Sequence, residues 1–157
     1  MSDKRDVKNF INGEQVDAKD GRTLDLIDPT TGEVFGTSPV SSADDVDAAY
    51  AAASKAFETW RDTTPSERQR ALLKFADAME ERAEEIIAAE CQNTGKPIEL
   101  TRTEEIPPAL DQIRFFAGAA RMLEGRSAGE YMAGHTSYIR REPVGAVEQL
   151  PPGTTRR

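Results

Sequence analysis

The chain has 157 residues, with 20 Lys and Arg against 28 Asp and Glu, which gives a net charge of −8. This balance argues against nucleic-acid binding, which needs clustered positive charge. An apolar share of 38% is too high for a disordered chain. No apolar run approaches the ~20 residues of a membrane-spanning helix, and no apolar segment follows the charged N-terminus as in a signal peptide.

Cysteine and histidine are each present once, as Cys91 and His135. A single cysteine cannot form an internal disulfide, which fits a reducing cytoplasm. The two residues are also too few for a zinc site of the usual His/Cys type. We therefore expect a cytoplasmic protein of about one domain, with no membrane or nucleic-acid partner.

Strand and turn signals fill the first forty residues. The segment from Phe10 to Gln15 contains Asn-Gly, the pair that a two-residue hairpin turn prefers because both central residues need positive φ. A strand is expected from Thr23 to Ile27, followed by a turn over 28–32 and a returning strand over 33–40.

Three helices are expected next. The first starts at Ser41 or Ser42, and its apolar residues recur at steps of three and four: Val46, Ala49, Tyr50, Ala53, Ala56, Phe57 and Trp60. The second has Thr64 as N-cap, Pro65 at the first helical position and Glu67 completing a capping box, and it ends at Gly95 and Pro97. Its expected buried face comprises Leu72, Phe75, Ala76, Met79, Ala83, Ile86, Ile87 and Cys91. The third is opened or kinked by the step Ile106-Pro107-Pro108, stops at Gly125 and carries Leu110, Ile113, Phe116, Ala117, Ala120 and Leu123.

Strand-like alternation returns from Thr136 to Val147, although Pro143 fits only an edge strand or a break. Residues 151–157 show no periodicity. The sequence thus predicts an α+β module.

The residues that could carry chemistry do not form an active-site pattern. Cys91 falls near a helix C-terminus, where the dipole disfavours a thiolate, so we expect a small core residue. His135 lies in a glycine-containing stretch and is expected in a surface loop. The acidic run over 80–85 mixes signs and is expected on a solvated helix face. The stretch Asn93 to Pro97 lacks phosphate-loop spacing and is expected to stop a helix, and no Gly-x-Gly-x-x-Gly occurs.

Several short motifs, each weak alone, occur in a family order and spacing over about residues 9–150. They are Phe10-Ile11-Asn12-Gly13-Glu14, the run from Asp28 to Val34, Ala56-Phe57 with Trp60, Arg68, Thr94-Gly95-Lys96-Pro97 and Arg141-Glu142-Pro143-Val144-Gly145. In these the chain resembles the NAD(P)-dependent aldehyde dehydrogenases. The resemblance implies an α/β fold of which this chain has the N-terminal part: β-hairpins, three helices, the start of the oligomerisation strand and an incomplete Rossmann-like sheet. The expected divisions are a flexible N-terminus over 1–8, part of the NAD-binding domain over 9–135, the oligomerisation strand with the start of a cofactor-domain strand over 136–147, and an aberrant tail over 148–157.

Within the family, the gamma-aminobutyraldehyde dehydrogenase branch is the most similar. The similarity lies in residues 104–108, 111–121 and 125–131. It implies oxidation of 4-aminobutanal to 4-aminobutanoate in putrescine breakdown. Betaine-aldehyde and succinate-semialdehyde dehydrogenases are close neighbours.

The tail departs from the family pattern. Where the family continues Pro-Trp-Asn-Tyr-Pro, whose Asn is an oxyanion-hole donor, this chain reads Pro152-Gly153-Thr154-Thr155-Arg156. Codons for the family motif read one base later give Pro-Gly-Thr-Thr-Arg. This indicates a frameshift near Pro151.

The resemblance places the catalytic Cys, the water-activating Glu and the nucleotide loop beyond this chain, so no catalytic residue is expected in it. It implies NAD and a homo-oligomer in the intact enzyme, and we expect the isolated chain to be inactive and to bind no NAD. Leu150 matches a nicotinamide-pocket position, and Ile27 and Asn93 match positions that hold a monovalent cation in some relatives. The alternative is a non-catalytic module that docks on full-length subunits through the strand over 136–144. Without the parallel sheet, the helices are expected to expose their apolar stripes.

Overall fold

A computed structural model describes residues 5–150 of the chain, so the shifted motif proposed near Pro151 lies outside the described residues. The first strand pairs are short. They comprise β1 (Arg5–Asp6), β2 (Asn9–Ile11), β3 (Glu14–Val16), β4 (Thr23–Ile27) and β5 (Val34–Pro39). Of the segment 1–8, for which we expected a flexible terminus, the described residues Arg5 and Asp6 pair with β5.

The strands form one sheet and a separate hairpin. In the sheet, β5 lies between β1, to which it is parallel, and β4, to which it is antiparallel. The hairpin joins β2 and β3 through Asn12 and Gly13, whose φ values of 54° and 84° confirm the turn predicted from Asn-Gly. Strand β4 has the predicted bounds.

Helix α1 (Ala43–Trp60) and helix α2 (Pro65–Glu81) begin where their caps predict. Ser42 donates from its backbone N–H and its hydroxyl to Asp45, at 2.8 and 2.7 Å. At the start of α2, the Thr64 N–H donates to Glu67 at 2.7 Å and the Glu67 N–H donates back to the Thr64 hydroxyl at 3.3 Å. Both capping boxes satisfy N–H groups that the helix itself leaves without partners.

The second predicted helix is two helices, α2 and α3 (Ala83–Thr94), so the prediction of one continuous helix was wrong. At Arg82, φ is −107° and ψ is 17°, and its N–H bonds the carbonyl of Glu80, which interrupts the helical ladder. The apolar residues of α2 and α3 keep the same three- and four-residue spacing across Arg82. The break between the two helices therefore could not be predicted from this periodicity. Gly95, with φ of 71°, ends α3 as predicted.

A short helix α4 (Ile98–Leu100) leads into a π-helical turn, η1 (Thr101–Glu105), and then into α5 (Ile106–Ala119). The prolines at 107 and 108 sit in the first turn of α5, where their missing N–H groups cost nothing. Helix α5 ends at Ala119, so Leu123 lies outside it, contrary to prediction. A final hairpin pairs β6 (Gly129–Met132) with β7 (His135–Ser137). The strand predicted over 136–147 is therefore present only in its first residues.

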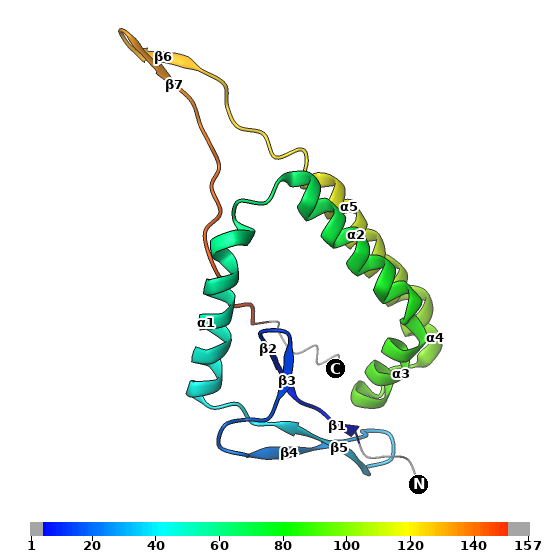
Figure 1. The fold of residues 1–157 in the computed structure, drawn as a ribbon. Coiled ribbons are helices and arrows are strands. Elements are labelled where there is room, and N and C mark those ends of the chain that lie inside the picture. The colour runs from blue at the N-terminus through cyan, green and yellow to red at the C-terminus, as the bar shows by residue number, and fades with distance from the viewer. Residues whose placement is uncertain (1–4, 151–157) are drawn as a thin grey trace.

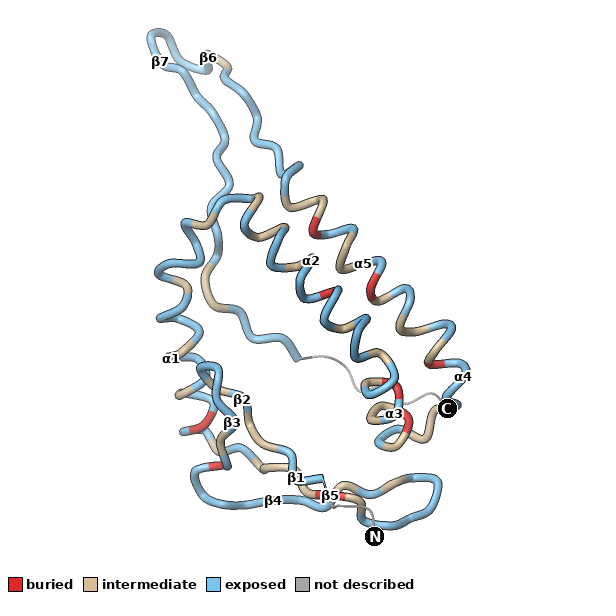
Figure 2. The backbone as a smooth tube through the Cα atoms, turned by 45° about the vertical axis from the view of Figure 1, so that its right-hand side comes forward, coloured by how far each residue is buried: buried red, intermediate tan, exposed pale blue. Residues whose placement is uncertain are grey.

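Helix α1 lies opposite the α2–α5 pair, the sheet lies at one end of these helices, and the β6–β7 hairpin projects away from the other end (Figure 1). Figure 2 shows few buried residues, which are scattered over the elements. They are Ala18, Gly36, Asp45, Ala76, Ile87, Cys91, Thr101, Leu110 and Ala117.

Large apolar side chains remain exposed on helices α1, α2 and α5. Phe75, which was expected on a buried face, is 55% exposed, and Phe116 and Trp60 are 60% and 48% exposed. Helices α2 and α5 contact each other, and Ala76 and Ala117 on them are fully buried. Adjacent residues of an α-helix point about 100° apart, so Phe75 and Phe116 face a different direction from these alanines. The expectation of exposed apolar stripes is confirmed. Within residues 5–150, no helix has the length and apolar character needed to span a membrane.

Candidate functional site

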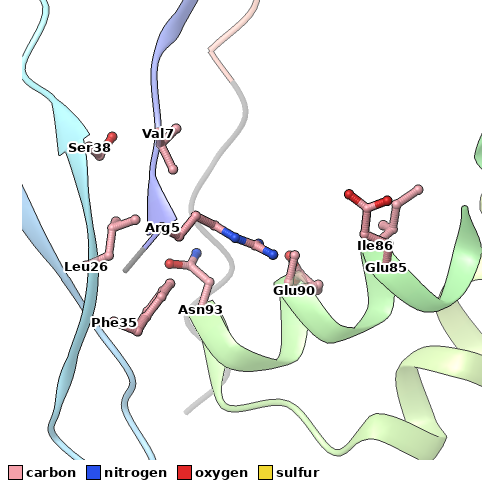
Figure 3. Close-up of a pocket in the computed structure, with 10 residues that line it drawn as sticks. Arg5, Val7, Leu26, Phe35, Ser38, Glu85, Ile86, Glu90 and Asn93 are labelled. Carbon is pink, nitrogen blue, oxygen red and sulfur yellow. The ribbon is translucent and has the colours of Figure 1, made fainter. Parts of the chain in front are cut away.

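A hollow of about 440 Å³ lies between the three-stranded sheet and α3, and we call it the sheet–α3 hollow. Its sheet side is formed by residues of β1, β4 and β5 with Val7, and its other side by one face of α3 (Figure 3). The residues are Arg5, Val7, Leu26, Phe35, Ser38, Glu85, Ile86, Ala89, Glu90 and Asn93.

Charged groups of both signs line this hollow. Arg5 extends from β1 toward α3 in Figure 3. Glu85 accepts two hydrogen bonds from Arg82, at 2.9 and 2.7 Å. Arg82 therefore lowers the pKa of Glu85, and the charge of Arg5 adds a smaller lowering. Glu90 accepts from Lys96 at 2.9 Å.

Lys96 bridges two segments, a role that sequence reasoning missed. Its ammonium group donates to Glu90 and to Glu105, each at 2.9 Å, which links α3 to η1. These hydrogen bonds raise the pKa of Lys96. The only sequence signal was the position of Lys96 directly after the helix-ending glycine.

Of the two residues matched to a cation position, Asn93 lines the hollow and Ile27 does not. Asn93 lines it at the end of α3, and Figure 3 shows its amide beside Arg5. Ile27 ends β4 beyond a register shift and is 54% exposed, while its neighbour Leu26 lines the hollow. No group of three or more His, Cys, Asp or Glu side chains within residues 5–150 could hold a metal ion.

Cys91 is a core residue, as predicted. It is 7% exposed, and its thiol donates to the hydroxyl of Thr101 at 3.4 Å. Thr101 is 1% exposed and donates to the carbonyl of Pro97 at 3.3 Å. This polar pair ties α3 to η1, so Cys91 is placed for packing and not for attack on a substrate. His135 is exposed at the start of β7, with Nδ1 3.1 Å from the carbonyl oxygen of Ala133.

The acidic run over 80–85 is exposed as predicted, but it takes part in more ion pairs than the local helical spacing suggests. Glu84 pairs with Arg102 at 2.7 Å, and Glu80 accepts from Arg114. Both arginines come from later elements, η1 and α5, and together with Lys96 they hold the helices to one another.

The starts of α1 and α2 do not offer a free site for the phosphates of a dinucleotide. Such a ligand needs free backbone N–H groups at a helix start after a glycine-rich turn. At the starts of α1 and α2, the carboxylates of Asp45 and Glu67 occupy the place where an anionic group would bind. Leu150 is 84% exposed. These two helix starts therefore offer no phosphate cradle.

Comparison with known proteins identifies the family. The model of the aldehyde dehydrogenase family matches residues 16–152. The chain therefore belongs to the aldehyde dehydrogenase family.

Individual relatives agree with this assignment. The chain is 40% identical to aldehyde dehydrogenase 1 of Tanacetum cinerariifolium over 148 residues, covering 93% of this chain and 30% of that protein. It is 39% identical to a long-chain-aldehyde dehydrogenase of Acinetobacter sp. over 149 residues, covering 95% and 29%. The chain thus spans about three tenths of the length of the curated relatives that it matches.

Solved structures show the same fold. The chain superposes on the NAD+ complex of aldehyde dehydrogenase from Bacillus cereus with a TM-score of 0.83 and 33% identity, covering 89% of this chain and 29% of that one. It superposes on PnpE from Pseudomonas sp. WBC-3 with a TM-score of 0.83 and 38% identity, covering 88% and 28%. The observed elements are accordingly those of the N-terminal part of the aldehyde dehydrogenase fold, which confirms the predicted fold class.

Proposed function

We propose that this chain is the N-terminal part of an NAD-dependent aldehyde dehydrogenase, an enzyme that oxidises an aldehyde to the carboxylic acid. The family match over residues 16–152 carries this proposal. A similar solved structure, from Bacillus cereus, is a complex with NAD+. In the longer enzyme, this part contributes scaffold: the sheet and the helix pairs on which other segments pack.

The chain by itself is inactive in this proposal. Its one thiol, Cys91, is buried and bonded to Thr101, and the starts of α1 and α2 are closed by their own carboxylates. The test is an NAD-linked aldehyde oxidation assay on the purified 157-residue chain. No NADH is expected above a protein-free control. Aldehyde-dependent NADH formation, abolished by Cys91→Ser, would refute the proposal.

The proposed substrate of the longer enzyme is 4-aminobutanal. Residues 104–108, 111–121 and 125–131 support this assignment by their similarity to the gamma-aminobutyraldehyde branch. We also propose that residues 152–156 are a shifted reading of the family's Pro-Trp-Asn-Tyr-Pro motif. The nucleotide sequence tests the shift, because a dehydrogenase reading frame must continue in another phase. With that frame restored, kcat/KM for 4-aminobutanal should exceed that for betaine aldehyde and for succinate semialdehyde.

Three site assignments belong to the same proposal. Asn93 and Ile27 hold a monovalent cation through side-chain and backbone oxygens, and Leu150 contributes to the nicotinamide pocket of the longer enzyme. The cation is tested by exchanging Na+ and K+ for tetramethylammonium at constant ionic strength. The thermal midpoint of the wild-type chain should fall and that of Asn93→Ala should not.

The proposed location of the protein is the cytoplasm. The single buried cysteine supports this location.

A second candidate function is docking on full-length dehydrogenase subunits through residues 136–144, the oligomerisation strand of the family. The projecting β6–β7 hairpin and the exposure of Tyr138, Ile139 and Val144, at 73%, 54% and 96%, favour it (Figure 1). Co-purification with an intact aldehyde dehydrogenase tests it. Ile139→Lys should abolish that association, whereas Leu24→Lys, an exposed apolar position in β4, should leave it intact.

A further inference from the structure

A second hollow, of about 810 Å³, lies where α1 ends and α2 begins, and we call it the α1–α2 corner. The segment after β7 returns alongside α1 (Figure 1). The hydroxyl of Tyr50 in α1 donates to the carbonyl of Ala146 at 3.2 Å, which fixes this return. Residues about 80 positions apart in the chain, Arg61 and Arg140 among them, therefore line one hollow.

Positive charge dominates the α1–α2 corner. Its lining includes four arginines, Arg61, Arg68, Arg140 and Arg141, against two carboxylates, those of Asp62 and Glu142. The chain as a whole carries a net charge of −8, so this excess of arginine is a local feature.

Neutral partners hold two of these arginines. Arg68 donates to the backbone carbonyl of Thr63, and Arg141 donates from Nε to the carbonyl of Glu124 at 3.1 Å. A carbonyl positions a guanidinium group without cancelling its charge. Arg61 forms an ion pair with Asp62 at 3.6 Å. Arg140 takes part in none of the ion pairs found among residues 5–150. Repulsion among these charges is relieved when an anion binds between them.

An apolar wall adjoins the arginines. Phe57 and Trp60, one helical turn apart near the end of α1, line the same hollow, and Trp60 is 48% exposed. Guanidinium groups pair with two oxygens of a carboxylate or phosphate at once, and they are suited to both anions. The volume falls in the range of about 300–1,000 Å³ that is usual for small-molecule sites.

We propose that the α1–α2 corner binds a small organic dianion, whose phosphate or carboxylate oxygens pair with Arg61 and Arg140 and whose apolar body lies on Phe57 and Trp60. The inference concerns binding alone and is independent of the proposed dehydrogenase reaction. Trp60 is the only tryptophan of the chain, so its fluorescence reports directly on this hollow.

The test titrates the 157-residue chain with phenyl phosphate, with phthalate and with neutral phenol at constant ionic strength and pH 7.5. Saturable change in Trp60 fluorescence is expected with at least one dianion. Saturation by only one of them assigns the charged group, and saturation by neither overturns the proposal. Phenol binding as tightly as the dianions also overturns it, because the arginines would then contribute nothing.

Three variants that each lose one positive charge distinguish binding in the α1–α2 corner from general electrostatic attraction of anions to the chain. Arg61→Gln and Arg140→Gln should each weaken binding about tenfold, since each loses a charged hydrogen bond. Arg70→Gln removes an exposed arginine of α2 that does not line the hollow, and it should change affinity less than twofold. Circular dichroism establishes that each variant keeps its helices. Equal weakening by Arg70→Gln contradicts the proposal.

Discussion

Substitution of Leu110 by alanine tests whether the contact between α2 and α5 is the main core of this chain. Leu110 is 6% exposed, and it is one of two buried residues on α5. The change removes three carbon groups at ~0.8 kcal/mol each, and the cavity left behind brings the expected cost to about 3 kcal/mol. Urea unfolding of the 157-residue chain, followed by circular dichroism, measures this loss as a lower midpoint.

Leu123→Ala is the matched control. The apolar spacing puts Leu123 in the same stripe as Leu110, yet the structure leaves it 70% exposed beyond the end of α5. Its replacement should cost under about 0.5 kcal/mol, as for other surface changes. If Leu110→Ala abolishes cooperative unfolding, Leu110→Val, which removes one carbon group, should cost ~1 kcal/mol. Equal costs at positions 110 and 123 would show that the packing described above is incorrect.

Three further outcomes are expected. Thr64→Ala removes the cap of α2 and should lower the free energy of unfolding by ~1 kcal/mol, whereas Thr64→Ser should retain most of it; urea midpoints compare the two. Hydrogen bonds from the backbone and hydroxyl of Ser42 lower the pKa of Asp45 in the folded chain. The ionised Asp45 therefore stabilises the fold at pH values above its unfolded pKa of about 3.9. This stabilisation is lost as the pH falls through the lower pKa of the folded chain. A carboxyl NMR titration should show the Asp45 pKa rise in Ser42→Ala, and an unchanged value would contradict the assignment. Lys96→Gln breaks the bridge between α3 and η1 and should destabilise the chain by under about 1 kcal/mol, with less effect in 1 M NaCl; a loss that salt does not alter would exclude an electrostatic cause.

Local chemistry allowed several elements to be predicted from the sequence. Thr64-Pro65 with Glu67 fixed the start of α2, and Asn12-Gly13 fixed a turn, because in each case neighbouring residues satisfy the backbone on their own. Burial was harder to predict. Phe75 belongs to an apolar stripe, but the contact that decides its burial comes from α5, more than thirty residues later.

Side-chain contacts between distant segments also escaped prediction. The ion pair between Lys96 and Glu105 depends on the π-helical turn η1. No residue pattern in the sequence predicted this turn. The α1–α2 corner depends on the return of the segment around Arg140 to α1, and no local signal encodes that path. Family membership was easier to identify, since the order of the short motifs is itself the signal.

The π-helical turn Thr101–Glu105 has a consequence for the tolerance of this chain to insertions and deletions. Each residue of an α-helix advances the side chains by about 100° around the axis. Deleting one residue from this wide turn would rotate all of α5 by about that angle relative to α3, and Leu110 and Ala117 would face water. The number of residues between Thr101 and Pro107 therefore determines the rotation of α5 about its axis relative to α3. Substitutions in η1 should be tolerated far more readily than any change in its length.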